Sequence, residues 1–141
     1  MAFTPGKGAV FSLDDAGGTL RTLTSYVDDV SGLPASQQLE DVTTFGNSGT
    51  RWIPTIQDAK FTVKGNFDST ATTGPYAVIN SLRTATATAS FEYGPEGSTT
   101  GKVKLSGECW LTDFTVDASV KGKVPFSASF QVDGVVTSGV Y

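Results

Sequence analysis

Two segments of this chain alternate between apolar and polar residues, and this alternation limits the fold more than any other feature of the sequence. In residues 60–67, Phe61 and Val63 fall on one face of an extended chain, and the polar residues between them fall on the other. Residues 125–132 repeat the pattern, with Phe126 as the first apolar residue. Each segment therefore predicts a half-buried β-strand with one polar side.

The composition favours a fold built mainly from such strands. Sixteen glycines and nine phenylalanines, together with many Thr, Ser and Val residues, are typical of all-β proteins. A chain of 141 residues with 38% hydrophobic content is suited to one domain with one modest core. We therefore expect residues 1–141 to form a single, mainly β domain.

Further strand patterns raise the prediction to roughly seven strands, arranged as a β-sandwich or a barrel-like sheet. In residues 102–120 the apolar residues change from odd to even positions, which predicts a bulge or bend within residues 110–113. The dipeptide Asp133-Gly134 predicts a hairpin turn, and the strand pattern that follows it leaves a potential open edge. The other predicted strands lie in residues 8–13, 20–30 and 88–94.

One short helix is expected at about residues 75–84. Pro75 suits the first helical position, and Thr73 or Gly74 can cap the helix. Apolar residues recur behind it at helical spacing, so the helix is amphipathic and is expected to cover an open face of the sheet. These apolar residues are Tyr76, Val78, Ile79 and Leu82.

Between the strands lies a long segment, about residues 31–54, that we interpret as an irregular loop. Its weak strand signals are broken by Gly32, Pro34, Gly46, Gly49 and Pro54. Loops of this length in a compact domain are uncommon and are usually functional or disordered. Disorder is disfavoured because several residues of the segment seek burial. These residues are Leu39, Val42, Phe45 and Trp52.

The pair Arg51-Trp52 within this loop admits two interpretations. The tryptophan can fold back on the core of its own domain with the arginine lying over it. Alternatively, the pair can anchor a contact with another protein, since Trp and Arg are enriched at such interfaces. The sequence leaves both open.

The absence of histidine removes most catalytic classes. Ser-His-Asp and Cys-His catalysis and the usual zinc sites all require it. The single cysteine, Cys109, lies in a strand-like run and is expected to be a small buried residue. We expect no catalytic residue, no cofactor and no metal site.

The charged residues likewise give no indication of a catalytic or nucleic-acid-binding site. The acidic pairs Asp14-Asp15, Asp28-Asp29 and Glu40-Asp41 are interpreted as solvated turn and strand-end charges, because adjacent strand residues point to opposite faces. A net charge of −4 argues against a protein that grips nucleic acid through its phosphates. The N-terminal residues show no signal-peptide pattern and no apolar stretch reaches membrane-spanning length, so a soluble intracellular product is expected.

The order of these features resembles the major tail protein, or tail-tube protein, of long-tailed, non-contractile (siphovirus-type) bacteriophages. The resemblance extends from about Lys7 to Gly139 and rests on an ordered set of segments rather than on one specific motif. The segments are GKGAVFSLDD, YVDDVSGLP, LEDVTTFGNSGTRWIPTIQDAKFTVKGNFD, the central helix, SFEYGPEG, LSGECWLTDFTVDASV and VPFSASFQVDGVVTSG.

This resemblance implies a β-sandwich with a flanking helix that assembles with itself into hexameric rings. The rings would stack into a tube in the virion, assembled in the host cytoplasm, whose inner sheets join into one barrel. It also implies a tape-measure protein, a tail terminator and baseplate or distal tail proteins as partners. Double-stranded DNA would pass through without specific binding, and no membrane would be involved.

For such an assembly we expect two sets of functional residues, one in contacts between subunits and one lining the lumen. The long loop is expected to contact another subunit, and alanine at both Arg51 and Trp52 is expected to impair polymerisation while leaving the domain folded. The contact residues are Asp41, Thr43, Phe45, Asn47, Arg51 and Trp52. The polar strand faces are candidates for the lumen, although they fit the solvent face of the tube equally well. These candidates are Thr62, Lys64, Asn66, Ser127, Ser129 and Gln131.

Two other functions remain as alternatives. A stand-alone β-sandwich module for binding or adhesion would be monomeric and would carry a row of exposed aromatic residues. A tube ring of a related secretion machine would share the fold expected here.

Overall fold

The computed structural model describes residues 3–33 and 36–141, which form nine strands, one α-helix and two 3-10 helices. The helical elements are η1 (Gly6–Gly8), α1 (Pro75–Ser81) and η2 (Leu82–Thr84). The strands are β1 (Val10–Asp14), β2 (Leu20–Thr22), β3 (Val27–Ser31), β4 (Ser36–Asp41), β5 (Trp52–Asp58), β6 (Lys60–Asn66), β7 (Ala89–Gly94), β8 (Val103–Val116) and β9 (Pro125–Val140). Within the described residues, no helix is long and apolar enough to cross a membrane.

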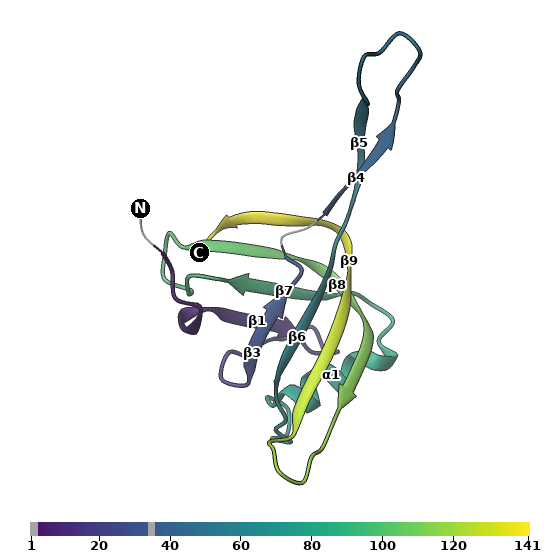
Figure 1. The fold of residues 1–141 in the computed structure, drawn as a ribbon. Helices are drawn as coiled ribbons and strands as arrows, with labels where there is room; N and C mark the ends of the chain where they lie inside the picture. The colour runs from purple at the N-terminus through teal and green to yellow at the C-terminus, as the bar shows by residue number, and fades with distance from the viewer. Residues whose placement is uncertain (1–2, 34–35) are drawn as a thin grey trace.

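Seven of the strands form one antiparallel sheet in the order β2-β1-β7-β8-β9-β6-β3. The long strands β8 and β9 bend, and the sheet folds back on itself into two layers (Figure 1). Phe61 of β6 and Phe91 of β7 demonstrate the folding, because their ring centroids lie 4.7 Å apart although β8 and β9 separate these strands in the sheet. The mainly β, sandwich-like architecture predicted from the sequence is therefore confirmed.

We call the two layers of the sandwich the arm layer, which has four strand segments, and the N-terminal layer, which has five. The arm layer consists of β3, β6, residues 125–131 of β9 and residues 110–116 of β8. The N-terminal layer consists of β2, β1, β7, residues 103–109 of β8 and residues 132–140 of β9.

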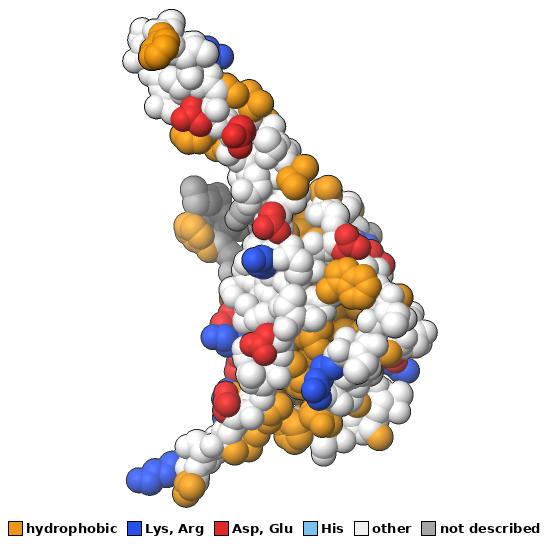
Figure 2. Space-filling model, turned by 90° about the vertical axis from the view of Figure 1, so that its right-hand side faces the viewer, with side chains coloured by type: hydrophobic (Ala, Val, Ile, Leu, Met, Phe, Trp, Pro, Cys, Tyr) orange, Lys and Arg blue, Asp and Glu red, His pale blue; other side chains and the backbone are white. Residues whose placement is uncertain are grey.

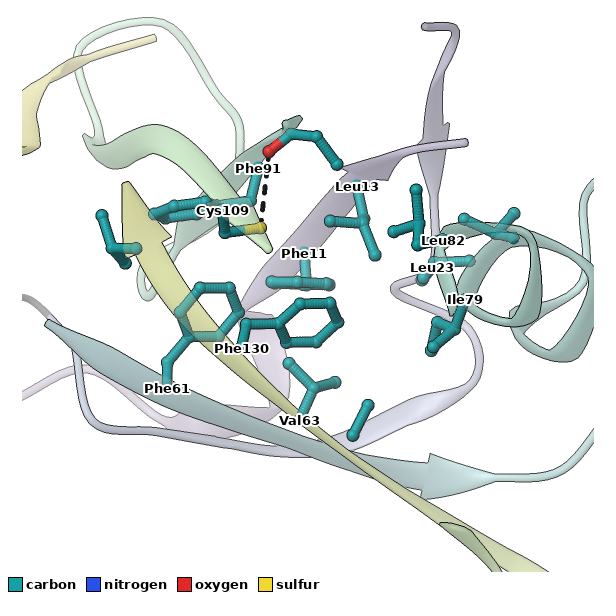
Figure 3. Close-up of a cluster of buried hydrophobic side chains, with 14 of the residues drawn as sticks. Phe11, Leu13, Leu23, Phe61, Val63, Ile79, Leu82, Phe91, Cys109 and Phe130 are labelled. Atoms are coloured by element: carbon teal, nitrogen blue, oxygen red, sulfur yellow. Dashed lines mark hydrogen bonds between the residues drawn. The ribbon is translucent and has the colours of Figure 1, made fainter. Parts of the chain in front are cut away.

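The core between the layers is built around packed phenylalanines (Figure 3). Phe61 stacks on Phe130 with ring centroids 4.9 Å apart and meets Phe11 edge to face at 6.2 Å. Removing each such ring from water stabilises the fold by about 2–3 kcal/mol. The alternation of residues 60–67 is confirmed, since Phe61, Val63 and Gly65 are buried between exposed or half-buried neighbours.

The predicted helix is confirmed as α1 followed by η2. Gly74 is the N-cap residue and Pro75 occupies the first turn. Val78, Ile79 and Leu82 are buried in the core, so the helix closes one end of the sandwich.

The bulge predicted within residues 110–113 is also confirmed. The pairing of β8 with β9 shifts by one residue between Leu111 and Asp113, so that Cys109 and Phe114 both face inward although their positions differ in parity. The extra residue lets one strand contribute to both layers.

Two strand predictions are wrong. Residues 20–30 form two strands, β2 and β3, because the buried Leu23 begins a turn in which Tyr26 N donates to Leu23 O at 3.0 Å. Asp133-Gly134 is not a hairpin, because β9 continues through it along β8. Gly134 has φ 92° at a register shift between β8 and β9, so the glycine supplies the conformation of a bulge.

Candidate assembly surfaces

A two-stranded arm, residues 36–58, projects from the sandwich (Figure 1). Strands β4 and β5 pair with each other and belong to a separate two-stranded sheet. The prediction of an irregular loop over residues 31–54 is therefore wrong at both ends, and only residues 42–51 connect the strands without strand structure. β4 and β5 are both edge strands of this small sheet. Pro54 is tolerated there because the N–H that a proline lacks is not needed on the unpaired side of an edge strand. Pro34 lies outside the described residues.

The tip of the arm is held by its own polar side chains. The carboxylate of Asp41 accepts a hydrogen bond from Thr43 N at 2.8 Å, and Thr43 Oγ1 accepts one from Arg51 N at 2.8 Å. Asn47 Oδ1 accepts from Thr44 N at 2.9 Å. Hydrogen bonds from the Thr43 side chain and backbone lower the pKa of Asp41 below its usual value, so it remains ionised. Three of the predicted contact residues, Asp41, Thr43 and Asn47, thus shape the turn itself.

Apolar side chains of the arm are exposed on both of its faces. The register Leu39↔Pro54 and Asp41↔Trp52 places Leu39 and Trp52 on one face, whereas Ile53, opposite Glu40, lies on the other. Trp52 is 54% exposed, and Phe45 at the tip is fully exposed. The interpretation of Trp52 as folded on its own core is therefore wrong.

This exposure is unusual for an isolated hairpin. Two strands without a packing partner are marginally stable in water, and contiguous apolar surface marks interaction sites. Val42 N also donates to Arg51 O at 2.9 Å, which continues the ladder and places Arg51 on the opposite face from Trp52. The arm thus offers two different surfaces to partners.

The arm layer has two open edges. β7 pairs with β8 only along residues 105–109, and no strand of the described residues pairs with the outer side of residues 110–116. At the other side of the layer, β3 pairs with β6 and with no further strand in residues 3–33 and 36–141. Open edges carry unpaired N–H and C=O groups that recruit further strands. The sequence indicates the open edge at residues 110–116, because the strand pattern of β8 is longer than that of β7 and therefore extends beyond its partner.

The six residues proposed for the lumen lie on neighbouring strands of the arm layer. Thr62 pairs with Ser129 and Lys64 pairs with Ser127, and these side chains point away from the core. Thr62 Oγ1 and Ser129 Oγ are 3.5 Å apart. The remaining two, Asn66 and Gln131, lie at opposite ends of the same strand pair. The structure therefore brings all six onto one polar surface.

On this surface, Gln131 connects β9 to the base of the arm. Its Nε2 donates to Asp58 Oδ1 at 2.7 Å and to Ala59 O at 3.1 Å. These bonds tie the base of the arm to β9. The direction in which the arm leaves the layer is thus held by side-chain as well as backbone contacts.

Two ionisable side chains outside the arm, Cys109 and Asp15, are held by local structure. Burial raises the pKa of the Cys109 thiol to about 12, and Sγ donates to Ala89 O at 3.4 Å, so this residue is the buried cysteine that was predicted. Asp15 accepts from Gly17 N at 2.9 Å and pairs with Arg21 at 3.1 Å, as a turn residue does. No group of three potential metal ligands occurs among the described residues.

Comparisons with known proteins find a similar fold in chains of solved tail and tube assemblies. No protein-family description matches the sequence, and no curated protein is significantly similar to it. A chain of the tail of an empty gene transfer agent particle, solved with C6 symmetry, is similar at a TM-score of 0.76 and 15% identity, covering 98% of this chain and 100% of that chain. A chain of the SPP1 tail tube is similar at a TM-score of 0.70 and 12% identity, covering 99% of this chain and 81% of that one.

A third similar chain comes from the sheath–tube complex of PVC, an extracellular contractile injection system, in its extended state. Its TM-score is 0.69 at 14% identity, with 99% of this chain and 93% of that chain covered. At these identities the comparisons demonstrate the fold. This chain has the fold of tail-tube proteins, and the fold expected from the sequence resemblance is confirmed.

Proposed function

We propose that this chain is a structural virion protein that assembles into stacked rings and forms the tube of a phage-type tail. The observation that carries the proposal is the four-stranded arm layer with an open edge on each side. A closed ring satisfies both edges without leaving a free strand for aggregation. The similarity to chains of the gene transfer agent tail and the SPP1 tail tube supports the same assembly.

Six copies suit the dimensions of a tube that conducts DNA. Four strands from each of six copies give about 24 strands, and a spacing of ~4.8 Å with a tilt of ~45° gives a barrel roughly 50 Å across its backbone. A layer of side chains narrows this width, and the remaining bore passes duplex DNA. The C6 symmetry of the gene transfer agent tail supports the choice of six.

The polar surface of the arm layer then lines the lumen. In a barrel closed through the edges of this layer, one face of each strand points to the core of its own subunit and the other points inward to the bore. Lys64 is the only cation among the six lumen candidates, and the chain carries a net charge of −4. DNA bears one negative charge per roughly 1.7 Å, so such a wall lets it pass without specific binding.

The arm makes the contact between subunits. Its exposed Phe45 and Trp52 are buried only when another copy covers them. A tape-measure protein inside the growing tube, a terminator and baseplate or distal tail proteins at its ends complete the set of partners. Assembly takes place in the host cytoplasm.

The second candidate is a tube ring of an injection machine rather than of a phage tail. The similarity to the PVC complex favours it. Both candidates require the same rings, so the first experiment addresses the rings themselves.

Negative-stain microscopy of the purified protein, together with its mass in solution, tests this function. We expect rings or long hollow tubes and a mass that is a multiple of the 14.7 kDa chain. A protein that stays strictly monomeric at high concentration and is retained on a sugar column contradicts the proposal and favours a stand-alone binding module.

A further inference from the structure

The arm joins the sandwich at the point where β6 and β9 stop running side by side. Lys60 and Gln131 form the last residue pair of these two strands, and Val132 N donates to Ala59 O at 2.9 Å just beyond it. From there β9 bends into the N-terminal layer, whereas β5, which precedes β6, extends outward in the arm (Figure 1). We call this branch point, residues 58–60 and 131–132, the fork.

The arm has little support outside the fork. Figure 2 shows it as a narrow projection that stands clear of the rest of the molecule. Within the described residues, β4 and β5 pair only with each other. A two-stranded ribbon of this kind has no third strand or helix to hold it in place. The direction of the arm therefore depends on contacts at its root.

The side chain of Gln131 bridges the fork. Its Nε2 donates to Asp58 Oδ1 at 2.7 Å and to Ala59 O at 3.1 Å. Asp58 is the only arm residue whose side chain is hydrogen-bonded to the sandwich among the described residues. A hydrogen bond to a carboxylate is stronger than one between neutral groups. Gln131 thus continues, with its side chain, the connection that the backbones of β5 and β9 no longer make.

The backbone around the fork is also closely packed. Ala59 is 1% exposed. Gly32, which follows β3 with φ 101°, lies so near the start of β6 that a Cβ atom on it would be 2.3 Å from Lys60 O. Closely packed backbone leaves little room for rotation. The root of the arm therefore has the structure of a rigid junction rather than of a flexible hinge.

We propose that Gln131 and Asp58 fix the direction of the arm in the free chain, so that the arm is preorganised before any other copy binds. Gln131 is then a positioning residue of the arm, in addition to its place on the polar surface. The benefit rests on the proposed tube function, because the apparent affinity between copies falls with the fraction of chains that hold the competent form. The direction of the arm in the free chain does not depend on that function.

Distances between two spin labels, measured by double electron–electron resonance, test this direction. Ser48→Cys places one label at the tip of the arm and Thr137→Cys places the other on β9, both at exposed positions. Cys109 stays unlabelled because it is buried and the pKa of its thiol is about 12. We expect one narrow distance distribution in the free chain, and the same mean distance in tubes of labelled chain diluted with unlabelled chain. A broad distribution in the free chain, or a mean that shifts on assembly, overturns the preorganised arm.

Gln131→Leu in the labelled chain tests the bridge itself. Ala59 O keeps its bond from Val132 N, so the variant leaves no buried carbonyl unpaired. We expect a broader distance distribution and a roughly tenfold rise in the concentration needed for tubes, because loss of a hydrogen bond to a charged group reduces the competent fraction by about that factor. Gln57→Leu is the matched control for arm direction, since the Gln57 amide on β5 has no hydrogen bond to a described residue. An unchanged distribution in Gln131→Leu overturns the proposal.

Two further variants separate the bridge from a general effect on the fold. Gln131→Lys keeps N–H donors within reach of Asp58 and Ala59 and is expected to restore the narrow distribution. Asp58→Leu is expected to broaden the distribution as Gln131→Leu does, and the double variant should be no broader than either single variant. Broadening that adds up in the double variant contradicts a shared bridge.

The two readouts distinguish this inference from the proposed function. A wild-type chain with a narrow distribution that forms no tubes contradicts the tube function and supports the fixed arm. A wild-type chain that forms tubes although its arm is broadly distributed when free contradicts the fixed arm and supports the tube function.

Discussion

Gly65 lies where β6 passes the beginning of β3, and the approach leaves no room for a side chain. A Cβ atom at this position would lie 2.1 Å from Tyr26 O and 2.9 Å from Val27 Cα, both of which are backbone atoms. Neither atom can move without disturbing the pairing of β3, which is an edge of the arm layer. A single hydrogen at Gly65 thus permits the geometry of a surface proposed for assembly.

Gly65→Ala is therefore expected to destabilise the fold. The clash forces a backbone shift, which costs about 1–3 kcal/mol. Urea unfolding followed by fluorescence measures the change in midpoint. Gly139→Ala is the matched control, because Gly139 also lies in a strand and has no atom within 4 Å of its added Cβ. Equal midpoints for the two variants would contradict the close approach.

Cys109 makes a second prediction at the scale of one residue. Its thiol is buried and burial raises its pKa from 9.0 to about 12, so it is expected to react with a thiol reagent at pH 8 only after unfolding. Since the pKa is higher in the folded state, the stability contributed by the protonated thiol is present below pH 9 and is lost as the pH rises towards 12. Rapid labelling of the native protein contradicts this account.

Strand β8 and the arm illustrate how far local sequence patterns determine an element. The parity change between Cys109 and Phe114 predicted the bulge because a buried face leaves a period-2 record in the sequence. The sequence of the arm has no such period-2 pattern, since the described residues bury neither of its faces, and Pro54 further weakens the strand signal. The hairpin predicted at Asp133-Gly134 was wrong for a related reason. A two-residue hairpin turn and the bulge found here both place a glycine at φ > 0, and only the partner strand distinguishes them.

The arm itself is expected to matter for assembly and not for folding. Arg51→Ala combined with Trp52→Ala changes exposed side chains, so the free energy of unfolding should change by less than about 0.5 kcal/mol while polymerisation is impaired. Thermal unfolding and microscopy measure the two effects. Undiminished tube formation by this double variant contradicts the role of the arm.

At the scale of the whole molecule, the fold followed from the sequence more completely than the assembly surfaces did. The order of strands and helix carried the resemblance to tail-tube proteins, and the solved tail and tube chains share that fold at 12–15% identity. The candidate lumen residues share one surface because β6 and β9 pair in register. The open edges of the arm layer depend on how β8 and β9 cross between the layers, which no local pattern specifies.

A cryo-electron microscopy reconstruction of the assembled tube tests the central claim most directly, because it traces the strands across subunit boundaries. The account predicts six-fold rings in which residues 110–116 of β8 in one copy lie beside β3 of the next, with Thr62, Lys64 and Ser129 facing the bore. A bore lined by the N-terminal layer, or arm layers that do not meet between copies, would contradict it.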